Sequence, residues 1–136
     1  IKEAEKALEK GEIPVGAIIV CNQTIIARGY NQVEQLNDCT AHAEMLAITS
    51  AQNYLGSRYL DKCTLYVTLE PCNMCAGAIF WTQLAKLVYA ARDEKRGFSQ
   101  TGNLLHPKTK VQTGILQQES SEMIKSFFKQ LRGNNS

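Results

Sequence analysis

The sequence of 136 residues has no apolar run close to the roughly 20 residues that a membrane-spanning helix needs. Its first residues, IKEAEKALEKGE, are charged and amphipathic and lack the basic-then-apolar order of a secretion signal. It also lacks internal repeats and low-complexity tracts, which argues against a solenoid and a disordered chain. We therefore expect a cytoplasmic globular protein. Because the sequence begins at Ile1, inside a helical pattern, we also expect further residues before it.

Cysteine and histidine are scarce, and the cysteine count excludes one class of small protein. The chain has five cysteines, an odd number, and two histidines. With 44% hydrophobic residues and a mass of 15.1 kDa, it can bury a core without disulfide bonds. A secreted disulfide framework is therefore excluded, and metal binding or burial is expected for the cysteines. We predict a single domain over residues 1–136.

No large charge excess of one sign is present, since the formal net charge is only +2. The charges are nevertheless unevenly distributed. Residues 1–85 carry six basic and nine acidic side chains, whereas residues 86–136 carry nine basic and four acidic ones. A basic C-terminal part is compatible with a polyanionic partner. Taken alone, this pattern favours a solvated surface.

Local patterns predict alternating helices and strands. Apolar runs predict strands at 13–20, 24–30, 64–70, 86–92 and 111–115, the first two joined as a hairpin by residues 21–23. Helical patterns occupy residues 1–10, 40–54 and 71–84, and a last helix holds Ile124, Phe127, Phe128 and Leu131. Thr40 is the expected N-cap of the second helix and Pro71 the expected first residue of the third. This order predicts a three-layer α/β/α domain with a five-stranded mixed sheet. Active sites in such sheets lie at strand ends where helices begin.

Two short motifs, TAHAE at 40–44 and EPCNMC at 70–75, stand where two predicted helices begin. Cys72 and Cys75 are three residues apart, so they share one helix face and can bind one soft cation. The helix N-terminus favours their thiolate forms. The intervening helix and strand can return the chain to the same end of the sheet, where His42 supplies a third ligand. Two thiolates and one imidazole suit Zn²⁺ and leave one tetrahedral position for water, as in catalytic zinc sites.

Glu44 stands two residues after His42, and this spacing predicts its role. Zinc lowers the pKa of a bound water from about 15.7 to about 7, which provides a hydroxide nucleophile at neutral pH. Residues two apart on a regular helix point to nearly opposite sides, so both cannot bind the metal from the middle of a helix. At the open end of a helix both can face a site ahead of it. We therefore predict that Glu44 transfers protons beside the water as general acid and base.

Two alternatives without catalysis use the same residues. Cys39 lies three residues before His42, and a C-x-x-H plus C-x-x-C set would form a closed four-ligand zinc site that only stabilises the fold. That alternative leaves Glu44 unexplained. Buried free cysteines with a core histidine form the second alternative. His106 stands in a polar loop and is expected at the surface, where it could contact a substrate. Cys21 and Cys63, in or beside predicted strands, are expected to be buried.

Four stretches carry a resemblance to a known family: IPVGAIIV, TAHAEMLAI, TLYVTLEPCNMCAGAI and YAARDEKRG. Together they resemble the bacterial tRNA-specific adenosine deaminases of the cytidine-deaminase-like superfamily, over nearly the whole chain. H-x-E followed by P-C-x-x-C is the signature of the zinc-dependent deaminases of nucleobases. The resemblance implies hydrolytic conversion of adenosine to inosine at the wobble position of a tRNA anticodon loop, one zinc ion per subunit and a homodimer.

The resemblance also implies roles for three further positions. Asn31, in RGYN, matches a residue that contacts the flipped nucleotide, and Asp93, in ARD, matches a residue near the ribose. The backbone of Ala43, in HAE, would face the base. The three zinc ligands and the glutamate keep the roles given above, and the basic excess after residue 85 would contact tRNA phosphates.

Other substrates and another class of function stay open. GAIFW is similar to the deaminases of free guanine, which share the zinc motifs and act on a small base. A deaminase of free guanine, cytosine or a nucleoside is therefore the main alternative to a tRNA enzyme. A non-catalytic, zinc-stabilised module is the more distant alternative.

Overall fold

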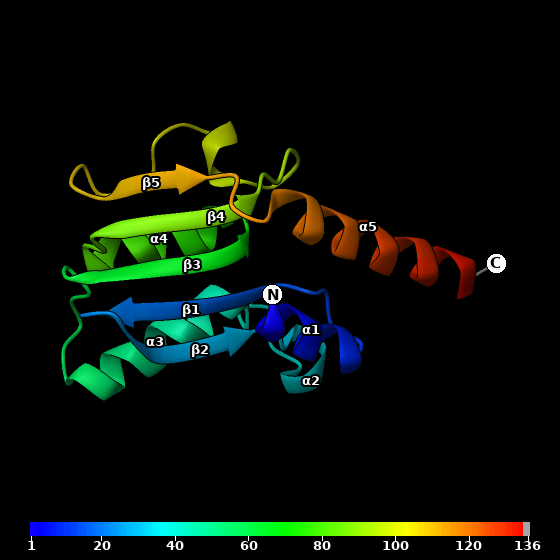
Figure 1. Cartoon of the computed structure of the whole chain (residues 1–136), viewed down its shortest axis with the longest axis horizontal. Coiled ribbons are helices and arrows are strands. Elements are labelled where there is room, and N and C mark those ends of the chain that lie inside the picture. The colour runs from blue at the N-terminus through cyan, green and yellow to red at the C-terminus, as the bar shows by residue number, and fades with distance from the viewer. Residues whose placement is uncertain (135–136) are drawn as a thin grey trace.

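The computed structural model describes residues 1–134, with side chains described up to Gln130. Its five strands form one sheet in the order β2-β1-β3-β4-β5 (Figure 1). The pairs β1–β2 and β1–β3 are antiparallel, and the pairs β3–β4 and β4–β5 are parallel, so the predicted five-stranded mixed sheet is confirmed. The strand bounds are β1 Gly16–Cys21, β2 Thr24–Tyr30, β3 Cys63–Leu69, β4 Lys86–Ala91 and β5 Lys110–Thr113.

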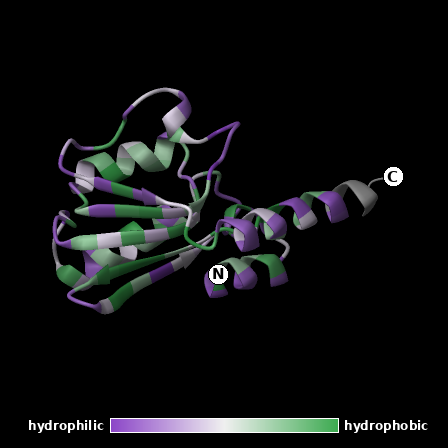
Figure 2. Cartoon of the chain, turned by 45° about the horizontal axis from the view of Figure 1, so that its top comes forward, coloured by the Kyte–Doolittle hydropathy of each residue, from purple (hydrophilic) through white to green (hydrophobic). Residues whose placement is uncertain are grey.

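Five α-helices and one 3₁₀ helix accompany the sheet in the described residues. They are α1 Lys2–Glu9, α2 Val33–Leu36, α3 Ala43–Leu55, α4 Asn73–Thr82, η1 Phe98–Gln100 and α5 Gln117–Asn134. Helices α3 and α4 lie behind the sheet in Figure 1, whereas α5 extends beyond the ends of the strands. Figure 2 shows hydrophobic residues along the strands and many hydrophilic ones along the C-terminal helix. Leu131 falls within α5, but its side chain lies outside the described residues.

The predicted hairpin and most predicted elements are confirmed, and two details of the helix starts are wrong. Asn22 and Gln23 connect β1 to β2 with positive φ angles of 51° and 62°, as a tight hairpin turn requires. Thr40 does not cap α3, because Asp38 Oδ1 accepts hydrogen bonds from the Thr40 N–H and Oγ1–H at 2.8 and 2.7 Å. Pro71 is not the first residue of α4, because the helix begins at Asn73 with Cys72 as its N-cap, and the Pro71 carbonyl accepts the Phe98 N–H at 3.0 Å. The four-residue helix α2 lies between the predicted strand 24–30 and the predicted helix 40–54, where no helix was predicted.

Helix α3 packs closely on β2, and this contact fixes the end of the helix that carries the predicted site. A Cβ added at Gly29 in β2 would lie 2.5 Å from the Ala43 carbonyl oxygen and 3.0 Å from the Ala47 nitrogen. Ala43 and Ala47 are fully buried, as small residues must be in such a contact. The absence of a side chain at Gly29 therefore determines how near α3 can approach the sheet.

Within residues 1–134, the structure contains no helix that meets the length and hydropathy needed to span a membrane.

We expect Gly29→Ala to destabilise the fold by about 1–3 kcal/mol, because the new methyl group must displace helix backbone. Gly77→Ala in α4 is the matched control. No atom lies within 4 Å of a Cβ at Gly77, so that change should be neutral or stabilise the helix by up to about 1 kcal/mol. Urea unfolding of both variants measures the difference. Equal stability of the two variants would contradict this account of the contact.

Candidate metal and catalytic site

Two helix N-termini converge at one end of the sheet, and their N-cap residues are predicted metal ligands. His42 is the N-cap of α3, with φ −74° and ψ 153°, and Cys72 is the N-cap of α4, with φ −74° and ψ 176°. Neither side chain makes a capping hydrogen bond to its own helix. The imidazole and the thiol are therefore free to face the space between the two helices.

The ligand atoms of His42, Cys72 and Cys75 form a compact triangle. His42 Nδ1 lies 3.7 Å from Cys72 Sγ and 3.5 Å from Cys75 Sγ, and one ligand atom of each residue lies within 4.8 Å of the others. Zinc–sulfur bonds of about 2.3 Å and zinc–nitrogen bonds of about 2.0–2.1 Å in a tetrahedron require nitrogen–sulfur separations of about 3.6 Å. The donor set and its spacing therefore fit Zn²⁺.

The three ligands shift one another's proton affinities in the metal-free chain. Hydrogen bonds from Cys75 and His42 lower the pKa of Cys72 to about 3, so this sulfur is a thiolate at neutral pH. Its hydrogen bond with Cys72 raises the pKa of His42, and the same thiolate together with burial raises the pKa of Cys75. Metal binding must therefore displace the proton of Cys75.

Glu44 lies in the first turn of α3 beside this triangle. Its side chain is only 4% exposed, and burial raises the pKa of its carboxyl group, opposed in part by His42. A buried carboxyl group with a raised pKa can hold and release a proton nearer to neutral pH than a solvated one. This environment suits the predicted acid–base role.

A pocket of about 720 Å³ opens above the triangle. Its volume is within the range of small-molecule sites. Six of the seven residues predicted from the sequence line it: Asn31, His42, Ala43, Glu44, Cys72 and Asp93. The seventh, Cys75, is fully buried. The structure therefore brings together residues that are up to 62 positions apart in the sequence.

Asn31 presents a buried acceptor with no partner. Its residue is 7% exposed, and its Nδ2 donates a long hydrogen bond of 3.4 Å to the Ile13 carbonyl. Asn31 Oδ1 is buried and accepts no hydrogen bond from the described residues. An unpaired buried acceptor costs about 1–3 kcal/mol, and a donor on a bound ligand would remove that cost.

Two buried glutamates, which the sequence analysis missed, hold the walls of this pocket. The Glu12 carboxylate accepts the backbone N–H groups of Glu34 and Gln35, at 2.9 and 2.6 Å, and so holds α2. The Glu70 carboxylate accepts the backbone N–H groups of Asp93 and Ser99, at 3.1 and 2.9 Å. Glu12 and Glu70 are 1% and 3% exposed. The only signal in the sequence is an acidic residue at the edge of an apolar run.

Cys39 and His106 are not part of the metal cluster. Cys39 lines the rim of the pocket and is exposed, and the cluster of close metal-binding donors among the described residues does not include it. The closed four-ligand alternative therefore lacks its fourth ligand. His106 does not line the pocket, and its ring lies 5.5 Å from the ring of Phe80.

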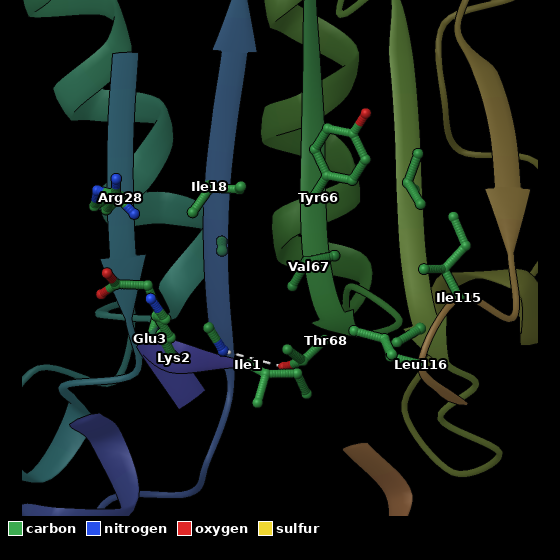
Figure 3. Close-up of a pocket in the computed structure, with 14 residues that line it drawn as sticks. Ile1, Lys2, Glu3, Ile18, Arg28, Tyr66, Val67, Thr68, Ile115 and Leu116 are labelled. Atoms are coloured by element: carbon green, nitrogen blue, oxygen red, sulfur yellow. Dashed lines mark hydrogen bonds between the residues drawn. The ribbon is translucent and has the colours of Figure 1, made fainter. Parts of the chain in front are cut away.

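A second hollow, of about 310 Å³, lies on the face of the sheet opposite to helices α3 and α4 (Figure 3). Ile18, Tyr66 and Leu116 line it, and the Gly16 N–H donates to Thr68 Oγ1 at 3.1 Å at its edge. It contains none of the residues predicted to bind metal or substrate. The residues predicted for chemistry therefore gather at the first pocket and not at this hollow.

Comparisons with known proteins agree with this geometry. Residues 1–91 match the cytidine and deoxycytidylate deaminase zinc-binding region. The tRNA-specific adenosine deaminase of Aquifex aeolicus (strain VF5) is 46% identical over 139 residues, which cover 98% of this chain and 92% of that protein. A solved structure from studies of A-to-I editing by tRNA:A34 deaminases at the wobble position superposes with a TM-score of 0.84 at 40% identity, covering 90% of this chain and 93% of that one. The guanine deaminase of Bacillus subtilis superposes with a TM-score of 0.65 at 46% identity, covering 68% of this chain and 59% of that one.

We expect Cys75→Ser to abolish zinc binding, because it removes one of three ligands. Cys39→Ser is the matched control and should retain about one zinc ion per chain, since Cys39 lies outside the cluster. Elemental analysis of the purified variants gives the zinc content. Loss of zinc from Cys39→Ser would restore the closed structural site as the better explanation.

Proposed function

Since the chain belongs to the cytidine and deoxycytidylate deaminase family, and within it to the tRNA-specific adenosine deaminases, we propose that it converts adenosine to inosine at the wobble position of a tRNA anticodon loop. The observation that carries the proposal is the zinc-ligand triangle with the buried carboxyl group of Glu44 beside it, at the base of a pocket large enough for a nucleoside.

The reaction is a hydrolysis at C6 of adenine that releases ammonia. His42, Cys72 and Cys75 would hold Zn²⁺, which lowers the pKa of water toward about 7. Glu44 accepts one proton from the attacking water and delivers it to N1 of the base as the C6–O bond forms. It then takes the remaining proton of the new C6 hydroxyl group and gives it to the amino group, which leaves as ammonia when the C6–N6 bond breaks. The burial that raises the pKa of Glu44 keeps the group able to accept and return the proton within one turnover.

Three residues that line the pocket are available to orient the adenosine. Asn31 Oδ1 would accept a hydrogen bond from the nucleotide, which would satisfy its buried lone pairs. The Ala43 N–H belongs to the first turn of α3, where backbone donors have no partner within the helix, and would face the base. Asp93 lies at the pocket wall, where it would be near the ribose.

An anticodon loop is a suitable substrate because its bases are unpaired and can enter a pocket at low cost. Phe127 and Phe128 of α5 line the pocket, where aromatic rings can stack on neighbouring bases. Lysines and arginines between Lys86 and Lys129 would neutralise phosphates. Arg132, which the sequence adds to this basic group, has a side chain outside the described residues. A tRNA substrate also implies that the protein acts in the cytoplasm.

A homodimer is part of the proposal. Helix α4 leaves Met74, in its first turn, 38% exposed and Trp81, near its C-terminal end, 76% exposed. Large exposed apolar side chains of this kind are typical of protein interfaces. A second copy that covers α4 would bury them.

We expect the zinc-loaded protein to form inosine in an anticodon stem-loop that carries adenosine at the wobble position, and to release an equal amount of ammonia. Free guanine, cytosine and adenosine should release none. Nucleoside analysis and an ammonia assay measure both products. Ammonia from free guanine alone would support the alternative that the structural likeness to guanine deaminase raises.

Glu44→Gln should retain zinc and lose about 10²–10⁴-fold in kcat, because the amide cannot accept and return the proton. The fold should persist, since glutamine fills the same buried volume. Elemental analysis and single-turnover kinetics on the stem-loop test the two parts separately. A variant that keeps its zinc and near-normal kcat would contradict the proposed proton transfer.

A further inference from the structure

Glu70 joins the metal site to the loop that follows β4. It lies between β3 and α4, two residues before Cys72, and its residue is 3% exposed. One carboxylate oxygen, Oε1, accepts the Asp93 N–H at 3.1 Å, and the other, Oε2, accepts the Ser99 N–H at 2.9 Å. The single carboxylate therefore holds both ends of the segment 93–99.

Backbone contacts attach the same segment to the same turn. The Phe98 N–H donates to the Pro71 carbonyl at 3.0 Å, and Cys72 and Gly97 form an isolated antiparallel bridge. A Cβ at Gly97 would overlap the Glu70 carboxylate, so the loop backbone rests directly on that group. The loop cannot shift without breaking its contacts to the turn that carries a zinc ligand.

The segment 93–99 is also closed internally, and this closure places Arg96. Asp93 Oδ1 accepts the N–H groups of Lys95 and Arg96, at 3.1 and 2.9 Å, and the Gly97 N–H donates to the Asp93 carbonyl at 2.9 Å. Arg96 lines the pocket and is exposed. Its guanidinium makes no ion pair with any carboxylate in the part of the chain that the structure describes.

Arg96 is the one lysine or arginine among the pocket-lining residues of the described chain. Five carboxylates share that lining: Glu12, Glu34, Glu44, Glu70 and Asp93. An RNA strand carries a phosphate on each side of the reacting nucleoside. Negatively charged carboxylates in the pocket lining repel these phosphates. A cation at this position would offset that repulsion, and a guanidinium binds phosphate through two parallel hydrogen bonds.

We propose that Glu70 is a positioning residue that holds the segment 93–99 so that Arg96 binds a backbone phosphate next to the target nucleotide. The inference rests on the proposed function, because it requires an RNA substrate. Glu70 acts through the loop and does not touch the reacting atoms. Its removal is therefore expected to weaken RNA binding with little effect on the chemical step.

A double-mutant cycle on the zinc-loaded protein tests this inference. Arg96→Ala should raise KM for the anticodon stem-loop about tenfold, with kcat within about twofold. It should also make the slope of log(kcat/KM) against log salt shallower by about 0.7, the value of one single-strand phosphate contact. Glu70→Gln, which replaces one acceptor oxygen with a donor, should raise KM by a similar factor and retain zinc. In the Arg96→Ala background, Glu70→Gln should add less than about twofold.

Glu3→Gln is the matched control, because Glu3 is also buried, at 5% exposure, and pairs with Lys6 on the far side of the sheet. It should leave KM and the salt slope unchanged. If the KM of the double variant rises by the product of the two single increases, Glu70 and Arg96 act independently, and the inference is overturned. An unchanged KM and salt slope in Arg96→Ala would do so as well, whatever the stability of Glu70→Gln, because Arg96 is a surface residue.

The same experiment separates this inference from the proposed function. If the wild type edits the stem-loop but the two substitutions act independently, the proposed function stands and only the role of Glu70 is contradicted. A wild type that leaves adenosine in the stem-loop unchanged contradicts the RNA substrate, and with it the phosphate contact.

Discussion

The close contact of helix α3 with strand β2 at Gly29 is the constraint on which the site depends. It fixes the height of the α3 N-terminus above the sheet, and therefore the positions of His42 and Glu44. Helix α4 is fixed independently, by the parallel crossover from β3 to β4. A zinc site with ligands from two helices requires both placements to be accurate, because metal–ligand distances tolerate an error of only about 0.2 Å.

The electrostatics of the site follow from this placement. The two helix N-termini point at the same space, and their backbone dipoles favour anionic ligands there. Cys72 lies in that field, and hydrogen bonds from Cys75 and His42 lower the pKa of its thiol further. Glu44 is in a different situation, because its burial favours the protonated form. Neighbouring groups in the first turns of two helices thus differ in proton affinity, as acid–base chemistry next to a metal requires.

The sequence predicted that His42, Cys72 and Cys75 cluster and that Glu44 lies beside them, because the spacing within each motif has a direct geometric meaning on a helix. It also predicted the mixed sheet, because apolar runs and turn residues alternate regularly. Glu12 and Glu70 were not predictable in the same way. Their partners are backbone N–H groups 22 to 29 residues away, which every residue type except proline provides. Helix α2 is too short, at four residues, to show a period.

Glu12 and Glu70 bind backbone N–H groups of α2 and of the segment 93–99. This affects which substitutions the pocket walls can accept. The hydrogen bonds that Glu12 and Glu70 accept do not depend on the side chains of the donor residues, although Gly97 must lack a side chain where it rests on Glu70. Substitutions at the rim can therefore accumulate without loss of the metal centre or the sheet, in nature or in directed evolution. Such a scaffold allows the substrate to change while the metal centre stays the same.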